Sequence, residues 1–187
     1  MVTRRDTYRF TVKKYEEMIR AGILDENDPV ELICGEIVEK MPIGDNHEAT
    51  VALLVEQFMI HLARRVTLWP QNSIRLFDSL PEPDVCLLER RADFYRSGKP
   101  TPANILLLIE VSDSTLEYDR TDKLTLYAEN GISEYWIINL VEEQIEVFRS
   151  PQSDGTYAQT SIHRRGETIS LVAFPNLSLA VNDLLPI

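Results

Sequence analysis

Two acidic residues of this chain stand beside apolar segments, where carboxylates are uncommon. Glu110 interrupts the apolar run of residues 105–111, whose length and branched side chains predict a strand covered on both faces. Asp84 follows Pro83 and opens a second apolar run, residues 85–88. An ionised carboxylate left unpaired in such surroundings is costly, so a cation, a metal or strong donors must lie close to Glu110. Two acids at neighbouring strand ends therefore predict a metal site.

Each acid also has a purely structural interpretation. Glu110 can be half of a buried ion pair, and Asp84 can be a turn residue after a proline. For any single acid these interpretations describe the commoner outcome. Only the combination of the two acids favours a functional site.

Composition and charge restrict the class of protein. The chain has 187 residues, 44% of them hydrophobic and 8% aromatic, which predicts one folded domain over residues 1–187 with a sizeable core. Its net charge of -11 argues against binding nucleic acid through bulk electrostatics, because phosphate neutralisation needs clustered Lys and Arg. Three local clusters can contact phosphate or serve as solvated surface: Arg64–Arg65, Arg90–Arg91 with Arg96 and Lys99, and Arg164–Arg165.

The sequence predicts a cytoplasmic protein without a membrane partner. No window approaches the roughly 20 consecutive apolar residues of a membrane span, and the start, Met1–Asp6, lacks the apolar core of a signal peptide. Cys34 and Cys86 are far apart and form no Cys-x-x-Cys or Cys/His ligand pattern. We therefore expect buried reduced thiols rather than a zinc site or a disulfide.

The first half of the chain reads as helix, hairpin and long helix. Apolar spacing predicts a short helix over Thr11–Ala21, and alternation around Gly35 predicts a hairpin over Val30–Val38. A long helix is expected over Asn46–Arg65, behind a capping box formed by Asp45 and Glu48. His47, at the start of this helix, is either a hydrogen-bonded structural histidine or a residue placed to touch phosphate.

The second half reads as a sheet interrupted by one helix. That helix, Asp119–Asn130, carries Lys123 and Tyr127 one turn apart, so Lys123 points toward the two acids if the helix begins at the end of the Glu110 strand. The long segment of residues 90–104 connects two of the strands. The expected strands are Ser73–Phe77, Val85–Glu89, Ile105–Val111, Glu134–Leu140, Gln144–Arg149, Tyr157–His163 and Ile169–Val172.

The order helix, three strands, helix, strand resembles the PD-(D/E)XK nuclease core. Within this order, one set of residues carries a narrower resemblance: Glu31–Val38, His47, Pro83–Val85, Glu110–Ser112, Asp119, Lys123–Leu124, Tyr127, Gly131 and Glu134–Ile137. As a set, these residues are similar to the bacterial Uma-two family of restriction-endonuclease-like proteins, from about Val30 to Pro175. The resemblance implies an α/β fold, with a mixed β-sheet flanked by helices and with an added N-terminal helix, a hairpin and C-terminal strands.

The resemblance also implies a chemistry. Asp84 and Glu110 would supply oxygen ligands to Mg²⁺ or Mn²⁺, with a backbone carbonyl near Val111 and waters completing the shell. The superfamily pattern has a lysine two residues after this glutamate, where the chain has Ser112. The resemblance therefore assigns the catalytic ammonium to Lys123. Possible accessory residues are Glu31, His47, Ser112, Asp119 and Tyr127, with a solvent-facing hairpin position as the alternative for Glu31.

Three functions compete at this stage. The first is a metal-dependent endonuclease acting on DNA, and the second is a catalytically idle protein of the same fold that binds nucleic acid or a protein. The third is a structural interaction protein in which Asp84, Glu110 and Lys123 form a buried ion network. The resemblance, together with a C-terminal segment rich in apolar residues, also predicts a homodimer. Those residues are Leu171, Val172, Phe174, Leu177 and Leu179.

Overall fold

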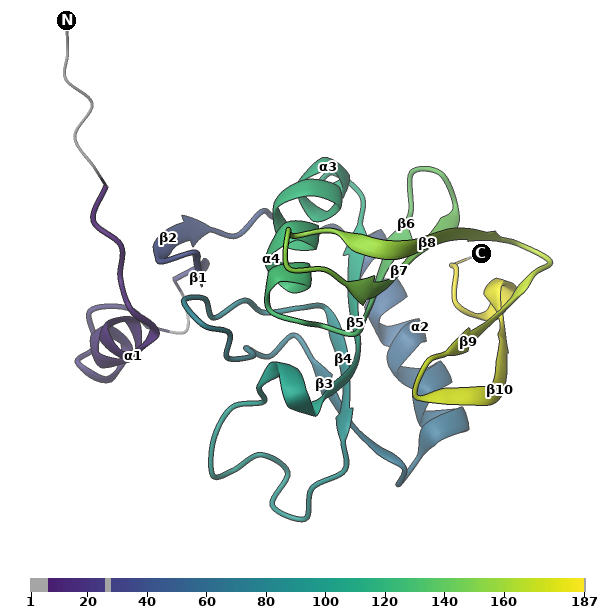
Figure 1. The fold of residues 1–187 in the computed structure, drawn as a ribbon, viewed down its shortest axis with the longest axis horizontal. Coiled ribbons are helices and arrows are strands. Elements are labelled where there is room, and N and C mark those ends of the chain that lie inside the picture. The colour runs from purple at the N-terminus through teal and green to yellow at the C-terminus, as the bar shows by residue number, and fades with distance from the viewer. Residues whose placement is uncertain (1–6, 26–27, 187) are drawn as a thin grey trace, which may run out of the picture.

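A six-stranded mixed sheet forms the centre of the molecule, as Figure 1 shows for the computed structural model, which describes residues 7–25 and 28–186. The start of the chain, Met1–Asp6, lies outside the described residues. The strand order is β3-β4-β5-β6-β7-β8, in which only the β5–β6 pair is parallel. The strands of this sheet are β3 (Val66–Pro70), β4 (Val85–Glu89), β5 (Ile105–Ser112), β6 (Glu134–Asn139), β7 (Gln144–Pro151) and β8 (Tyr157–Arg164).

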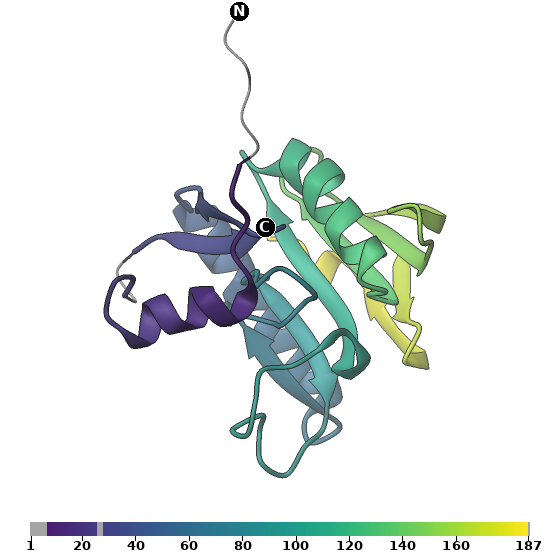
Figure 2. The same cartoon turned by 60° about the vertical axis from the view of Figure 1, so that its left-hand side comes forward.

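Helices cover both faces of this sheet, and for that reason its central strands are mostly apolar. On one face α2 (Asp45–Leu62) packs against alternate residues of β5, including Leu107 and Ile109. On the other face α4 (Leu124–Glu129) packs with Leu108 in a second core cluster. The two covering layers are seen most clearly by comparing Figures 1 and 2. The mixed α/β architecture predicted from the sequence is confirmed.

A small N-terminal unit lies beside the sheet. It combines α1 (Val12–Arg20) with the hairpin of β1 (Val30–Ile33) and β2 (Glu36–Glu39), which turns at Gly35 with a φ of +76°. A β-carbon at this glycine would lie 2.9 Å from the side chain of Arg9, so the turn requires glycine both for its backbone and for its space. The predicted N-terminal helix and hairpin are therefore present.

One predicted strand is wrong. Residues Ser73–Phe77 form an irregular segment. The strand that pairs with β4 at the edge of the sheet is instead β3, which follows shortly after α2. Ile74 and Leu76 are nevertheless buried, while Phe77 is 93% exposed. The backbone of this segment, however, bonds to the loops at Ser79, Pro81 and Pro100 rather than to a neighbouring strand.

The helices also differ from the sequence prediction at their ends. The long helix ends at Leu62, and its N-cap is Gly44, so the predicted capping box of Asp45 and Glu48 does not form. The helical segment expected over Asp119–Asn130 begins earlier, at Leu116, and consists of three short pieces. These are α3 (Leu116–Tyr118), a π-helical turn (Asp119–Lys123) and α4.

The C-terminal segment makes a separate two-stranded sheet. β9 (Thr168–Leu171) pairs with β10 (Phe174–Ala180) and does not extend the main sheet, contrary to the prediction for Ile169–Val172. Leu171 and Leu179 enter the core beside α2, and only Val172 is exposed among the residues on which the homodimer prediction rested. Short 3₁₀ turns complete the chain at Pro102–Asn104 and Val181–Asp183. Within the described residues, the structure has no helix long and apolar enough to cross a membrane.

Candidate active site

The two acids singled out in the sequence lie side by side. Asp84 immediately precedes β4, and Glu110 lies near the end of the antiparallel strand β5, so both reach the same end of the sheet. Each carboxylate accepts a hydrogen bond from a backbone amide at or next to the other acid. The amide of Asp84 donates to Oε2 of Glu110 at 3.3 Å, and the amide of Val111 donates to Oδ2 of Asp84 at 2.8 Å.

The second oxygen of Glu110 is held by two donors from the following helical segment. Oε1 accepts hydrogen bonds from Nζ of Lys123 at 2.9 Å and from the hydroxyl of Tyr127 at 2.6 Å. Burial raises the pKa of Glu110 to about 8, Lys123 opposes that rise, and the charges of Asp84 and Asp119 add to it. Glu110 is thus a buried carboxylate with both favourable and repulsive neighbours.

Lys123 is more enclosed than the sequence suggested. We expected its stem to reach the site while the ammonium stayed solvated, but the side chain is only 12% exposed. Burial acts to lower the pKa of Lys123, yet Glu110, Glu31 and Asp119 outweigh it, so the pKa is raised. The ammonium is therefore charged and fixed beside Glu110.

The π-helical turn brings a third acid toward the site. Asp119 is 2% exposed, and its Oδ2 accepts hydrogen bonds from Ser112 at 2.7 Å and from Thr115 at 2.6 Å. Its other oxygen lies 3.9 Å from Nζ of Lys123. Ser112, which replaces the lysine of the superfamily pattern, thus fastens the turn that carries Lys123. Single π-helical turns of this kind are frequent at functional sites.

His47 approaches Asp84 from the first turn of α2. Its Nε2 lies 2.9 Å from Oδ2 of Asp84, and its buried Nδ1 has no partner among the described residues. Burial acts to lower the pKa of His47, but the hydrogen bond and the charge of Asp84 outweigh it and raise the pKa. The histidine therefore orients Asp84, in agreement with the hydrogen-bonded alternative of the sequence analysis.

A cavity of about 940 Å³ opens onto these residues. Glu31 lines it and is only 6% exposed, so its alternative as a solvent-facing hairpin residue is wrong. The carboxylate of Glu31 accepts a hydrogen bond from the amide of Glu82 at 3.1 Å. The other polar groups of the lining include Lys40, Glu39, Gln71, Asp113, Ser114, Thr115 and Tyr118.

The structure brings together every site residue predicted from the sequence, but not in one role. Asp84, Glu110, Lys123, His47, Asp119 and Glu31 line the cavity, whereas Ser112 and Tyr127 support it from behind. Sequence reasoning missed Tyr118, whose pKa burial and Glu31 raise to about 12, and Lys40, which pairs with Glu82 in the lining of the cavity. Neither residue had a local pattern that distinguished it from surface.

The donor set suits a hard divalent cation. Carboxylate oxygens of Asp84 and Glu110 are the ligands that Mg²⁺ and Mn²⁺ prefer, and Asp119 and Glu31 add negative charge that Lys123 alone does not balance. Within residues 7–25 and 28–186, no group of three or more His, Cys, Asp or Glu side chains has the geometry to enclose a metal. A bound ion would therefore have to complete its shell with backbone oxygen and water, which is the usual habit of Mg²⁺.

Two comparisons with known proteins found matches to this chain. The family model of Uma2, described as "putative restriction endonuclease", matches residues 12–182. This chain belongs to the Uma-two family. A crystal structure from Anabaena variabilis ATCC 29413, described as "a putative nuclease belonging to DUF820", superposes with a TM-score of 0.69.

That Anabaena protein is 18% identical to this chain, and the alignment covers 94% of this chain and 97% of the other. A match of this extent at such low identity shows that the Uma-two chain has the same fold over nearly its whole length. No curated protein matches the chain.

Proposed function

We propose that this Uma-two protein is a metal-dependent endonuclease that hydrolyses DNA phosphodiester bonds. The observation that carries the proposal is the pairing of Asp84 and Glu110 at one end of the sheet, beside the buried ammonium of Lys123 and open to a cavity. A purely structural ion network does not need a cavity of about 940 Å³ lined by further acids. The family described as restriction endonucleases supports the same reaction class.

The residues divide the work between them. Asp84 and Glu110 would hold Mg²⁺ or Mn²⁺, with the peptide carbonyl near Val111 as a further oxygen donor. When bound, such an ion supplies Lewis acidity to the phosphate and acidity to water. Lys123 offsets negative charge that develops on the phosphate, because its ammonium is charged and already fixed 2.9 Å from Glu110.

Other residues keep this arrangement rigid. His47 holds Oδ2 of Asp84, and Tyr127 holds Oε1 of Glu110, so neither carboxylate has to reorient when a substrate arrives. Ser112 and Thr115 fix Asp119 and thereby the π-helical turn. Preorganisation of this kind is what a site needs in order to act without large rearrangement.

Cleavage of supercoiled plasmid is the direct test. Wild-type protein should nick the plasmid with Mg²⁺ or Mn²⁺ and should not do so with a chelator. Asp84→Asn should reduce the rate by about 100-fold or more, since it removes a charged ligand and leaves the fold intact. Asp122→Asn is the matched control, because Asp122 is an exposed acid of the π-helical turn beside the site and does not line the cavity.

The outcomes separate this proposal from the idle-fold alternative. Metal binding without cleavage of plasmid, single-stranded DNA or RNA would favour a nuclease-fold protein that acts as a binding module. Equal cleavage by wild type and Asp84→Asn would assign the activity to a contaminant. Absence of both metal binding and cleavage would leave the structural ion network as the surviving interpretation.

The homodimer stays a prediction that rests on the resemblance alone. Leu171 and Leu179 complete the core of a single chain, and Phe174 and Leu177 pack against that core. The apolar content of the segment is thus explained without a partner. Light scattering that gave 21.5 kDa over a wide range of concentration would contradict the dimer.

A further inference from the structure

Two pairs of arginines that are separate in the sequence meet at the end of the sheet opposite the cavity. Val66, the first residue of β3, is the register partner of Glu89, the last residue of β4. Arg64 and Arg65 directly precede Val66, and Arg90 and Arg91 directly follow Glu89. The antiparallel pairing of β3 with β4 therefore makes the two pairs of arginines neighbours. In Figures 1 and 2 this end of the sheet lies toward the bottom of the picture, and β2 and α3 lie toward the top.

We call the exposed arginines Arg64, Arg65, Arg90 and Arg96 the basic end. All four are exposed, and none forms an ion pair with a described carboxylate. Even with Glu89 beside them, they form a positive patch on a chain whose net charge is -11. Most described cations elsewhere face a carboxylate, among them Arg9, Lys40, Arg75, Arg120, Arg149 and Arg165.

Neutral rings hold two of these guanidinium groups. Arg65 lies over the ring of Phe174, with 4.4 Å between the guanidinium carbon and the ring centroid, and Arg90 lies over Phe94 at 5.1 Å. A ring fixes an arginine without neutralising it, whereas a carboxylate partner would cancel its charge. The two side chains are therefore ordered in advance and keep their charge for a ligand.

The loop that carries Arg90 and Arg96 is held in a strained conformation. Phe94 and Tyr95 have φ values of 49° and 62°, in the left-handed region that non-glycine residues seldom adopt. Asp93 keeps the loop in this shape by accepting hydrogen bonds from Arg91 at 2.7 Å and from Ser97 at 2.6 Å.

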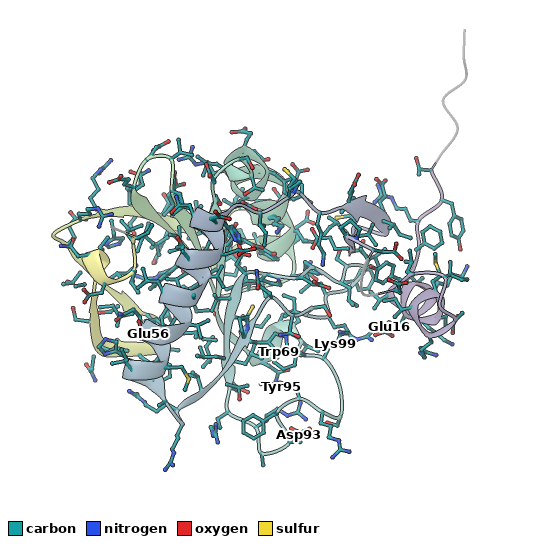
Figure 3. The ribbon with its side chains drawn as sticks, turned by 180° about the vertical axis from the view of Figure 1, so that it is seen from behind. Glu16, Glu56, Trp69, Asp93, Tyr95 and Lys99 are labelled. Carbon is teal, nitrogen blue, oxygen red and sulfur yellow. The ribbon has the colours of Figure 1, made fainter. Side chains whose placement is uncertain are left out.

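The buried ring of Tyr95 anchors the same loop to the sheet. It packs edge-on against Trp69 with 5.9 Å between ring centroids, and its hydroxyl donates to the carbonyl of Glu89 at 2.8 Å. Figure 3 labels Trp69, Tyr95 and Asp93 at this place. The loop is therefore a surface feature with a fixed shape that presents arginines outward.

We propose that the basic end binds the phosphate backbone of duplex DNA at a distance from the cavity. Exposed arginines that are ordered but not neutralised match a regular array of phosphates. The five residues of β4 separate the two ends of the sheet by about 17 Å, which corresponds to about five nucleotides of one strand. The choice of DNA as the polyanion rests on the proposed function, whereas the binding itself does not require cleavage.

The remaining basic residues of the sequence clusters do not belong to this surface. Lys99 turns away to donate to the hydroxyl of Ser73, and Arg165 faces Glu143 at the other end of the sheet. Arg164 and Arg20, which are exposed and without an ion pair in the described chain, lie on other elements. These two supply a charge-matched control.

Fluorescence anisotropy with a labelled duplex in the presence of a chelator tests the proposal, since no metal-dependent cleavage can occur. Four phosphate contacts predict an affinity that falls by about 100-fold between about 50 and 200 mM salt. Arg64→Glu with Arg90→Glu should bind at least about 10-fold more weakly at low salt, and its affinity should fall by only about 10-fold over the same range. Arg20→Glu with Arg164→Glu carries the same change of charge and should bind like wild type.

Every outcome bears on the basic end. An equal loss in both double variants would mean that only total charge matters, and would overturn the proposal, as would the absence of wild-type binding at low salt. Loss of a self-associated species in the Arg64/Arg90 variant, seen by light scattering without any effect on DNA, would assign the surface to a second copy of the chain.

Melting temperatures establish whether each variant is folded. If the variant with Arg64→Glu and Arg90→Glu is not folded, the variant with Arg64→Ala and Arg90→Ala takes its place. If DNA binding depends on the basic end while no metal supports cleavage, the proposed function fails and this inference stands. If cleavage occurs but DNA binding does not depend on the basic end, this inference fails and the proposed function stands.

Discussion

Glu110 and Glu134 are both buried carboxylates, on the neighbouring parallel strands β5 and β6, yet their surroundings are opposite. Among the described residues, the carboxylate of Glu134 contacts only hydrogen-bond donors. Arg149 lies 2.7 Å away, the indole of Trp136 donates at 2.9 Å and the amide of Val172 donates at 2.7 Å. Glu110 has Lys123 and Tyr127 as donors, but it also faces Asp84 and Asp119 and lines a cavity.

The difference separates the candidate site from a structural ion pair. Burial of a carboxylate is common to both, so burial alone says nothing about function. Repulsion from other acids and access to a cavity are found only at Glu110, and both are what a cation-binding position requires. Glu134 instead ties β6 to β7 and to the C-terminal strands.

The largest expected effect separates the two glutamates by metal binding. Glu110→Gln should abolish Mn²⁺ binding, because it removes a charged oxygen ligand, and it should not lower the free energy of unfolding, because it also removes repulsion from Asp84 and Asp119. Glu134→Gln should leave the Mn²⁺ affinity unchanged. Calorimetric titration measures both, and unchanged affinity in Glu110→Gln would refute the metal site.

The stability of the fold should show the opposite pattern. Arg149→Met leaves the fully buried carboxylate of Glu134 without its cation, and we expect a loss of about 3 to 5 kcal/mol in the free energy of unfolding. Arg9→Met breaks an exposed pair with Glu36 and should cost about 1 kcal/mol or less. Urea denaturation compares the two variants, and similar losses in both would contradict the structural role of Glu134.

A further variant tests the role of the cation beside Glu110. Lys123→Ala should leave Mn²⁺ binding nearly intact but should slow plasmid cleavage by about 100-fold, because it removes stabilisation expressed mainly in the transition state. Lys99→Ala, which removes an exposed lysine outside the cavity, is the control. Cleavage at the wild-type rate would reduce Lys123 to the partner of a structural carboxylate, like Arg149.

The smallest effect concerns a third buried acid, Glu146. Burial acts to raise its pKa, but hydrogen bonds from Arg120 and Asn139 outweigh it, so the pKa lies below its ordinary value of 4.5. Its stabilisation is therefore present above about pH 4.5 and is lost as the pH falls through the lower, folded-state pKa. Glu146→Gln should cost about 1 to 2 kcal/mol near neutral pH, and the difference from wild type should shrink in acid.

Denaturation over a series of pH values measures this difference. Glu142→Gln is the control, because Glu142 is the more exposed carboxylate on the same arginine and its pair should contribute little. A difference for Glu146→Gln that grows as the pH falls would contradict the lowered pKa.

Most of the sheet was predictable because its strands are long apolar runs bounded by turn residues. The error at Ser73–Phe77 has a physical reason. Period-two burial requires only that alternate side chains face a core, which Ile74 and Leu76 do, whereas a strand also needs a partner for its backbone. β3 was missed because it begins at Val66, directly after the helix expected over Asn46–Arg65.

The candidate site was predictable in its residues but not in its form. The acids were visible because charge in an apolar run is unusual, and Lys123 was visible through the resemblance. The π-helical turn was not, because one extra residue in a helix leaves no mark in a pattern of apolar spacing. The basic end was equally hidden, since strand register rather than sequence distance makes Arg65 and Arg90 neighbours.

The hydrogen bonds from the amide of Asp84 to Glu110 and from the amide of Val111 to Asp84 affect how the chain folds. Each carboxylate is seated only when β4 and β5 pair in one register, so a slip by one residue would remove both contacts together. The two acids therefore come together only when the strands pair in the native register. Recovery of Mn²⁺ binding during refolding would report when β4 and β5, whose pairing spans the long loop of residues 90–104, have found each other.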